Sequence, residues 1–127
     1  MTALDDAPAT PTTARSEETW VAICPLDRVS VGRGVAALIG DTQVAVFRLT
    51  DGPEPDLRVV DNIDPFGRAA VMSRGLVGDR AGVPTVASPL LKQVFSLDTG
   101  VCLDDESRAL RMYPVRVVDG TIEVCAP

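Results

Sequence analysis

Glycine and proline interrupt this chain so often that the evidence for helices is weak. The 127 residues include ten glycines and ten prolines spread along the sequence, and no window keeps an apolar repeat of 3.6 residues between helix caps. The clearest segment is the C-terminal "YPVRVVDGTIEVCA", where Asp119-Gly120 separates two runs rich in β-branched residues. An Asp-Gly pair between two such runs is a strong signal for a β-hairpin.

Further strand-like runs precede this hairpin. "GVAALIGDTQVAVFRL" (34–49) indicates a hairpin that turns at Gly40-Asp41. The other runs are "TWVAIC" (19–24), "DLRVVDN" (56–62), "VPTVAS" (83–88) and "KQVFSLD" (92–98). We therefore expect an all-β domain over residues 19–127, a small antiparallel sandwich or barrel of about seven to nine strands. Residues 1–18 lack periodicity and are expected to form a disordered tail.

Charge and composition exclude several classes of function. The net charge of −6 and a pI near 4.5 argue against nucleic-acid binding, which needs basic side chains to neutralise phosphates. No apolar run approaches the length of about 20 residues that crosses a bilayer, and the N-terminus does not resemble a signal peptide. We expect a cytoplasmic protein without membrane contact. Its three cysteines, Cys24, Cys102 and Cys125, are spaced like isolated thiols rather than a disulfide framework.

The absence of histidine removes most catalytic arrangements. Without histidine, neither a Ser-His-Asp nor a Cys-His nucleophile can be built. Ser73 and Ser88 have no base to activate them, and the glycines at 32–40 lack the Lys-Ser/Thr of a phosphate-binding loop. Asp61, Asp64 and Asp79 could serve as acids or metal ligands, but Asp beside Pro or Gly is more often turn chemistry. No catalytic or cofactor-binding residue is expected.

Two proline-containing loops carry the functional signal. The segments are "DNIDPF" (61–66) and "VASPLLKQVFSLDTG" (86–100). With "SRGLVGD" (73–79) and the final hairpin, their arrangement resembles a Rieske-type domain, in which two hairpin loops each donate one Cys and one His to a two-iron, two-sulfur cluster. The first loop keeps Asn62 and Pro65 of that family's pattern, and the second keeps Pro89, Phe95, Leu97, Thr99 and Gly100.

All four ligand positions differ from the family pattern. Asp64 and Phe66 stand where the first loop would have Cys and His, and Ser88 and Leu91 stand at the corresponding positions of the second loop. Phe66 and Leu91 have no donor atom, and no histidine elsewhere could replace them. We expect no metal and no cofactor in this chain, and we expect Phe66 and Leu91 to fill the space of the cluster with apolar packing.

One branch of the Rieske superfamily has lost its ligands in this way. The segments 73–79, 87–106 and 113–124 are similar to the small subunit of assimilatory NAD(P)H-dependent nitrite reductase. This resemblance implies a large-subunit partner that carries FAD, siroheme and an iron–sulfur cluster and reduces nitrite to ammonium in nitrogen assimilation. It implies that this chain is a docking or stabilising subunit without a redox group.

The resemblance also suggests a docking surface, because loops on a rigid β scaffold present side chains outward. The interface candidates are Phe66, Arg68, Leu90, Leu91 and Lys92. Further candidates, which could instead be ion-paired within the chain, are Arg74, Asp79 and Arg80. An equal alternative places Phe66 and Leu91 in the core and the two basic residues in solvent.

Rival functions come from other classes of protein. A stand-alone protein-binding module on the same degenerate fold stays open. An electron carrier conflicts with the missing cluster ligands, and a hydrolase conflicts with the missing nucleophile.

Overall fold

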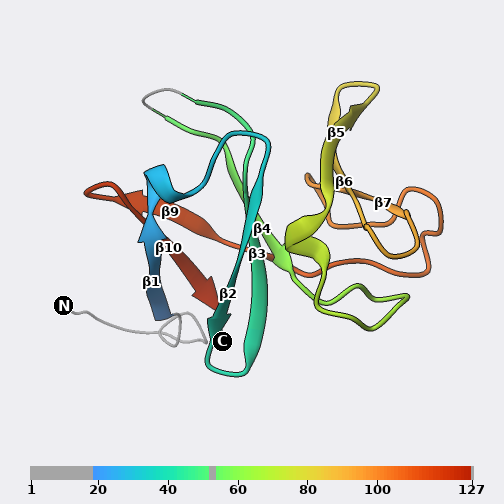
Figure 1. Cartoon of the computed structure of the whole chain (residues 1–127), viewed down its shortest axis with the longest axis horizontal. Helices are drawn as coiled ribbons and strands as arrows, with labels where there is room; N and C mark the ends of the chain where they lie inside the picture. The colour runs from blue at the N-terminus through green and yellow to red at the C-terminus, as the bar shows by residue number, and fades with distance from the viewer. Residues whose placement is uncertain (1–18, 52–53, 127) are drawn as a thin grey trace, which may run out of the picture.

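The computed structural model describes residues 19–51 and 54–126, which form an all-β fold (Figure 1). The tail expected over residues 1–18 lies outside the described residues. The strands are β1 (Thr19–Pro25), β2 (Gly34–Ile39), β3 (Thr42–Arg48), β4 (Leu57–Asp61), β5 (Leu76–Arg80), β6 (Val83–Ala87), β7 (Val94–Ser96), β8 (Met112–Tyr113), β9 (Val115–Val118) and β10 (Thr121–Ala126). Two short 3-10 helices span Leu26–Arg28 and Met72–Arg74.

The strands form three antiparallel sheets. Their orders are β1-β10-β9, β2-β3-β4-β8 and β5-β6-β7. In Figure 1 the sheet containing β3 and β4 lies between the other two, with the β5-β6-β7 unit to one side. The predicted hairpin turns at Gly40-Asp41 and Asp119-Gly120 are confirmed, because Ile39 pairs with Thr42 and Val118 pairs with Thr121.

The central sheet is buried on both faces. On β3, Val44 and Val46 face a core shared with β10, whereas Ala45 and Phe47 face a second core. Successive side chains of a strand point to opposite faces, so one strand can contribute to both cores. This is why the run "VAVF" is continuously apolar rather than alternating. Phe95 is fully buried in the second core and ties the β5-β6-β7 unit to the central sheet.

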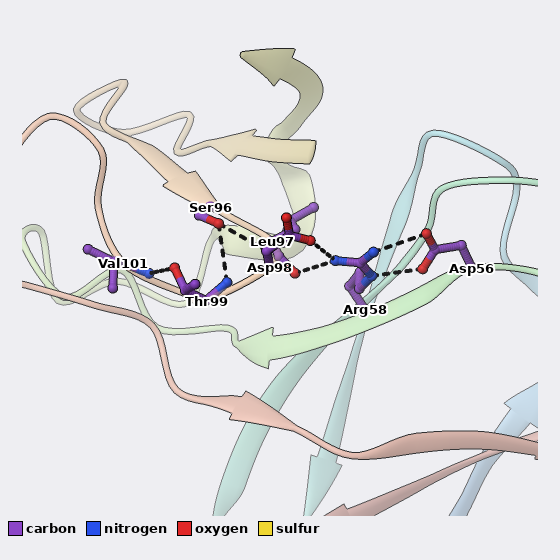
Figure 2. Close-up of polar contacts among 7 residues, drawn as sticks. All are labelled: Asp56, Arg58, Ser96, Leu97, Asp98, Thr99 and Val101. Carbon is purple, nitrogen blue, oxygen red and sulfur yellow. Dashed lines mark hydrogen bonds and ion pairs between the residues drawn. The ribbon is translucent and has the colours of Figure 1, made fainter. Parts of the chain in front are cut away.

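Arg58 of β4 joins the central sheet to the third sheet (Figure 2). Its guanidinium donates to both carboxylate oxygens of Asp56, at 2.7 and 3.1 Å, and to the backbone oxygen of Leu97 at 2.7 Å. The Nη1 atom also lies 2.7 Å from Oδ1 of Asp98. The planar five-donor fork of arginine suits this arrangement of acceptors.

The turn after β7 is closed by its own side chains (Figure 2). The Ser96 hydroxyl accepts the backbone N–H groups of Asp98 (3.0 Å) and Thr99 (3.2 Å), and Oγ1 of Thr99 accepts from Val101 (3.2 Å). Gly100 has a φ of +85°, the left-handed conformation that the sequence predicts for this glycine. The "DTG" motif therefore has a conformational role.

A side-chain hydrogen bond of Tyr113 joins β8 to β4. The hydroxyl of Tyr113 donates to Oδ1 of Asp61 at 2.6 Å, and Oδ2 of Asp61 accepts the backbone N–H of Arg111 at 2.9 Å. Burial, followed by the hydrogen bond to Asp61, raises the pKa of Tyr113 to about 12.

We predict that Tyr113, the single tyrosine of the chain, ionises near pH 12 in the folded protein and near pH 10 in denaturant. The raised pKa stabilises the fold fully below pH 10. This contribution, about 3 kcal/mol, is lost as the pH rises through 12. A near-ultraviolet tyrosinate titration checks it, and equal midpoints in both states would contradict it.

Candidate functional site

The first proline loop is closed by Asp64. The carbonyl of Asp64 accepts the N–H of Arg68 at 2.7 Å, and its own N–H donates to the oxygen of Ala69 at 2.9 Å. Its Oδ1 accepts the N–H groups of Phe66 at 2.8 Å and Gly67 at 3.2 Å. Asp64 thus satisfies the amides of its own loop, as Asp residues do in turns.

The second proline loop repeats this backbone geometry around Ser88. The carbonyl of Ser88 accepts the N–H of Lys92 at 3.0 Å, and its N–H donates to the oxygen of Gln93 at 2.9 Å. Its hydroxyl oxygen accepts the N–H of Leu90 at 3.2 Å. Lys92 and Arg68, at equivalent positions, both have a φ of 63°. The two loops therefore have the same backbone pattern.

A buried hydrogen bond joins the two loops. The hydroxyl of Ser88 donates to Oδ2 of Asp64 across a sequence separation of 24 residues. Asp64 is 0% exposed and Ser88 is 1% exposed. A buried carboxylate is costly unless its oxygens are hydrogen-bonded, and here both oxygens accept. The Asp64–Ser88 bond lies at the two positions where the resemblance places cysteine ligands.

The side chains at the four ligand positions do not fit a two-iron cluster. Asp64 and Ser88 bond to each other, while Phe66 and Leu91 carry no donor atom. Cluster iron in Rieske domains is held by two thiolates and two imidazoles. Across residues 19–51 and 54–126, no group of three or more His, Cys, Asp or Glu side chains is placed to hold a metal ion.

The apolar packing expected of Phe66 and Leu91 is found for Phe66 alone. The half-buried Phe66 ring packs against the second core, 6.1 Å from the ring of Phe95. Leu91 is 55% exposed, so its predicted packing is wrong. Leu90 instead bridges the loops: a Cβ added at Gly67 would lie 2.1 Å from Cδ2 of Leu90, so a side chain at position 67 would displace Leu90 from this contact.

The loop tips expose two apolar and two basic side chains. Leu90 and Leu91 are 46% and 55% exposed, and Arg68 and Lys92 are also exposed. We call these four residues the loop-tip surface. A third cation lies beside it, because Nη1 of Arg108 donates to the backbone oxygen of Pro65 at 3.0 Å and its guanidinium lies 5.7 Å from the Phe66 ring centre.

Sequence reasoning did not identify Arg108 as a site residue. It lies 43 residues from Pro65, in a segment with no motif, and only the fold places it on the first loop. Its guanidinium over the aromatic face is a favourable cation–π arrangement.

The remaining candidates do not converge on one site. Asp61 accepts from Tyr113 and Arg111, and Asp79 accepts the N–H of Gly82 at 3.3 Å in an exposed turn. Nη1 of Arg80 lies 3.4 Å from Oδ1 of Asp104, and both side chains are exposed to solvent. Turn chemistry accounts for Asp79, a surface ion pair for Arg80, and the hydrogen bonds to Tyr113 and the backbone of Arg111 for Asp61.

The chain matches the Rieske-like [2Fe-2S] domain family over residues 19–125. It is 43% identical over 105 residues to the nitrite reductase (NADH) small subunit of Salmonella typhimurium strain LT2, a match that covers 83% of this chain and 95% of that protein. A crystal structure from Mycobacterium tuberculosis, titled as a candidate NADH-dependent nitrite reductase small subunit, is 49% identical with a TM-score of 0.80. It covers 87% of this chain and 96% of its own.

A further relative places the same domain inside a much longer chain. The nitrite reductase [NAD(P)H] large subunit of Klebsiella oxytoca is 41% identical over 105 residues, which is 83% of this chain and only 11% of that protein.

No helix in the described part of this chain is long and apolar enough to span a membrane.

Proposed function

The chain belongs to the Rieske-like [2Fe-2S] family and, within it, to the small subunits of NADH-dependent nitrite reductase, and from this membership we propose that it is a cluster-free docking subunit. Its partner is the large subunit that reduces nitrite to ammonium with electrons from NAD(P)H. The flavin, siroheme and iron–sulfur cluster of the reaction belong to that partner, and the complex works in the cytoplasm.

The Asp64–Ser88 hydrogen bond carries this proposal. It occupies the two cysteine positions, and both carboxylate oxygens of Asp64 already accept protein donors. A loop pair held in this way keeps the shape of a cluster-binding tip but has no group that accepts an electron. We therefore assign the chain no step in electron transfer.

The Klebsiella oxytoca relative supports docking. Because its large subunit contains a domain 41% identical to this chain, the two parts are covalently joined there. Fusion keeps a domain at high effective concentration beside the rest of its chain. A separate small subunit must reach the same position through its surface.

The loop-tip surface is the docking surface that we propose. Its two exposed leucines, with an exposed arginine and lysine in the same loops, have the composition of an interface, in which an apolar core has a polar rim. Phe66 supports this surface rather than forming part of it, because its half-buried ring packs against the second core.

We predict that Leu91→Asp weakens binding to the large subunit by about 30-fold, or about 2 kcal/mol, because it places a charge in the apolar centre of the interface. Leu91 is 55% exposed, so the variant should fold like the wild type. Co-expression, co-purification and nitrite-dependent NADH oxidation measure the effect. The control is Val118→Asp, an exposed residue on the β9–β10 hairpin of another sheet.

The alternative function, a stand-alone protein-binding module, predicts a different result. In that case the wild-type chain would not co-purify with the large subunit, whose activity would not depend on it. If wild type and Leu91→Asp bound the large subunit equally well, the complex would be supported, but its interface would lie away from the loop tips.

A further inference from the structure

Strand β2 is an open sheet edge without the usual protection. It pairs with β3 on one side and with no other described strand on the other. Its sequence "GVAALI" has no charge and no proline, and its register with β3 runs without a bulge. Leu38 is 67% exposed. Proteins normally shield such an edge with charges, proline or bulges, because it can pair with another strand.

The unpaired backbone groups of β2 can be located. The N–H of Arg48 donates to the oxygen of Arg33 at 3.3 Å, so these two residues form a hydrogen-bonded pair. Hydrogen-bonded and non-hydrogen-bonded pairs alternate along antiparallel strands. Ala36 and Leu38 therefore lie at non-hydrogen-bonded positions toward β3, and their N–H and C=O groups point toward the open edge.

A groove runs along this edge. Its volume is about 470 Å³, and it is lined by Val21–Cys24 of β1, Val35–Leu38 of β2 and Arg28. Strand β1 is also the last strand of its sheet, but a register shift between Ala22 and Cys24 and a terminal proline limit its pairing. Four residues on each wall correspond to about 13 Å of strand.

We propose that β2 accepts an extended segment of the large subunit, which adds a strand to the central sheet along this groove. Main-chain groups of Ala36 and Leu38 would pair with the segment, as in other cases of strand addition. An apolar segment with one carboxylate fits the lining, because Arg28 is the one charged side chain there. This inference rests on the proposed function, and it adds a second contact to the loop-tip surface.

The fused relative supports this occupant. In the Klebsiella oxytoca protein the rest of the large-subunit chain must join the domain at an end of the matched region. In this chain the family match over residues 19–125 begins in β1 and ends in β10, and β1 forms one wall of the groove. Large-subunit chain is therefore available beside the groove.

Ala36→Pro tests the proposal, because it removes an outward N–H without removing a bond to β3, and proline is tolerated on edge strands. We expect a tenfold or greater loss of large-subunit binding. Val118→Asp, an exposed variant on the β9–β10 hairpin outside the groove, should bind like wild type. As a second variant, Leu38→Lys adds a charge at an exposed edge position and should also weaken binding. Thermal unfolding checks that each variant is folded.

Hydrogen exchange by mass spectrometry gives a direct readout. In the wild-type complex, the peptide containing residues 34–39 should exchange at least tenfold more slowly than in the free chain. Unchanged exchange there in a complex that forms, or full binding by Ala36→Pro and Leu38→Lys, would overturn the strand-addition proposal alone. Failure of the wild type to bind the large subunit would overturn the proposed function as well. A wild-type homodimer abolished by Ala36→Pro would replace the occupant with a second copy.

Discussion

Replacing Asp64 with alanine is expected to lower the free energy of unfolding by about 4 kcal/mol. The change removes the acceptor of the Ser88 hydroxyl and of two loop amides, those of Phe66 and Gly67. The Ser88 donor is buried, and a buried donor left without a partner costs about 1–3 kcal/mol; the two loop amides are half-buried and each loses a hydrogen bond as well. The loss is thus at the high end for a single substitution.

Denaturant unfolding measures this effect. The matched control is Asp79→Ala, which removes an exposed carboxylate bonded to one turn amide and should cost less than about 1 kcal/mol. A double-mutant cycle with Ser88→Ala should show coupling, because both residues share one hydrogen bond. If Asp64→Ala were no more destabilising than Asp79→Ala, the bond would not hold the loops together.

Gly100→Ala is expected to lower the free energy of unfolding by more than about 3 kcal/mol. Gly100 has a φ of +85°, and a Cβ there would lie 2.1 Å from the backbone oxygen of Leu110. The oxygen cannot withdraw freely, because the N–H of Leu110 donates to the carbonyl of Gly100 at 2.7 Å. Strained φ adds about 1–3 kcal/mol to the clash.

Gly120→Ala is the control that separates strain from clash. Gly120 has a similar φ of +79° in the β9–β10 turn, but no atom lies within 4 Å of its added Cβ. Gly120→Ala should therefore lower the free energy of unfolding by the conformational cost alone, about 1 kcal/mol. Thermal or denaturant unfolding of both variants checks the difference, and equal losses would remove the role we give to the Leu110 contact.

Local patterns predicted the hairpins well. The Gly40-Asp41 and Asp119-Gly120 turns and the strands beside them follow from turn chemistry and β-branched runs. Strand β5 was missed because "LVGDR" is mostly exposed and includes glycine, an aspartate and an arginine, so it lacks an apolar signal. Strand β8 was missed because it is only two residues long and is held by tertiary contacts with β4.

The site was predicted in part. The sequence pattern aligned Asp64 with Ser88, but their hydrogen bond is a tertiary contact that no local rule provides. The sequence left Leu91 either packed or on the docking surface, because the pattern located it in the loop without showing that Leu90, rather than Leu91, packs on Gly67. The open edge of β2 required the sheet order, which depends on pairings across the whole chain.

The most direct test of a cluster-free subunit is an iron and acid-labile sulfide analysis of the chain, expressed in iron-replete cells and purified without oxygen. We predict a colourless protein with far less than one iron per chain, because Asp64 and Ser88 are hydrogen-bonded to each other and Phe66 and Leu91 cannot coordinate iron. Two irons and two sulfides per chain, with visible absorption that bleaches on reduction, would contradict it.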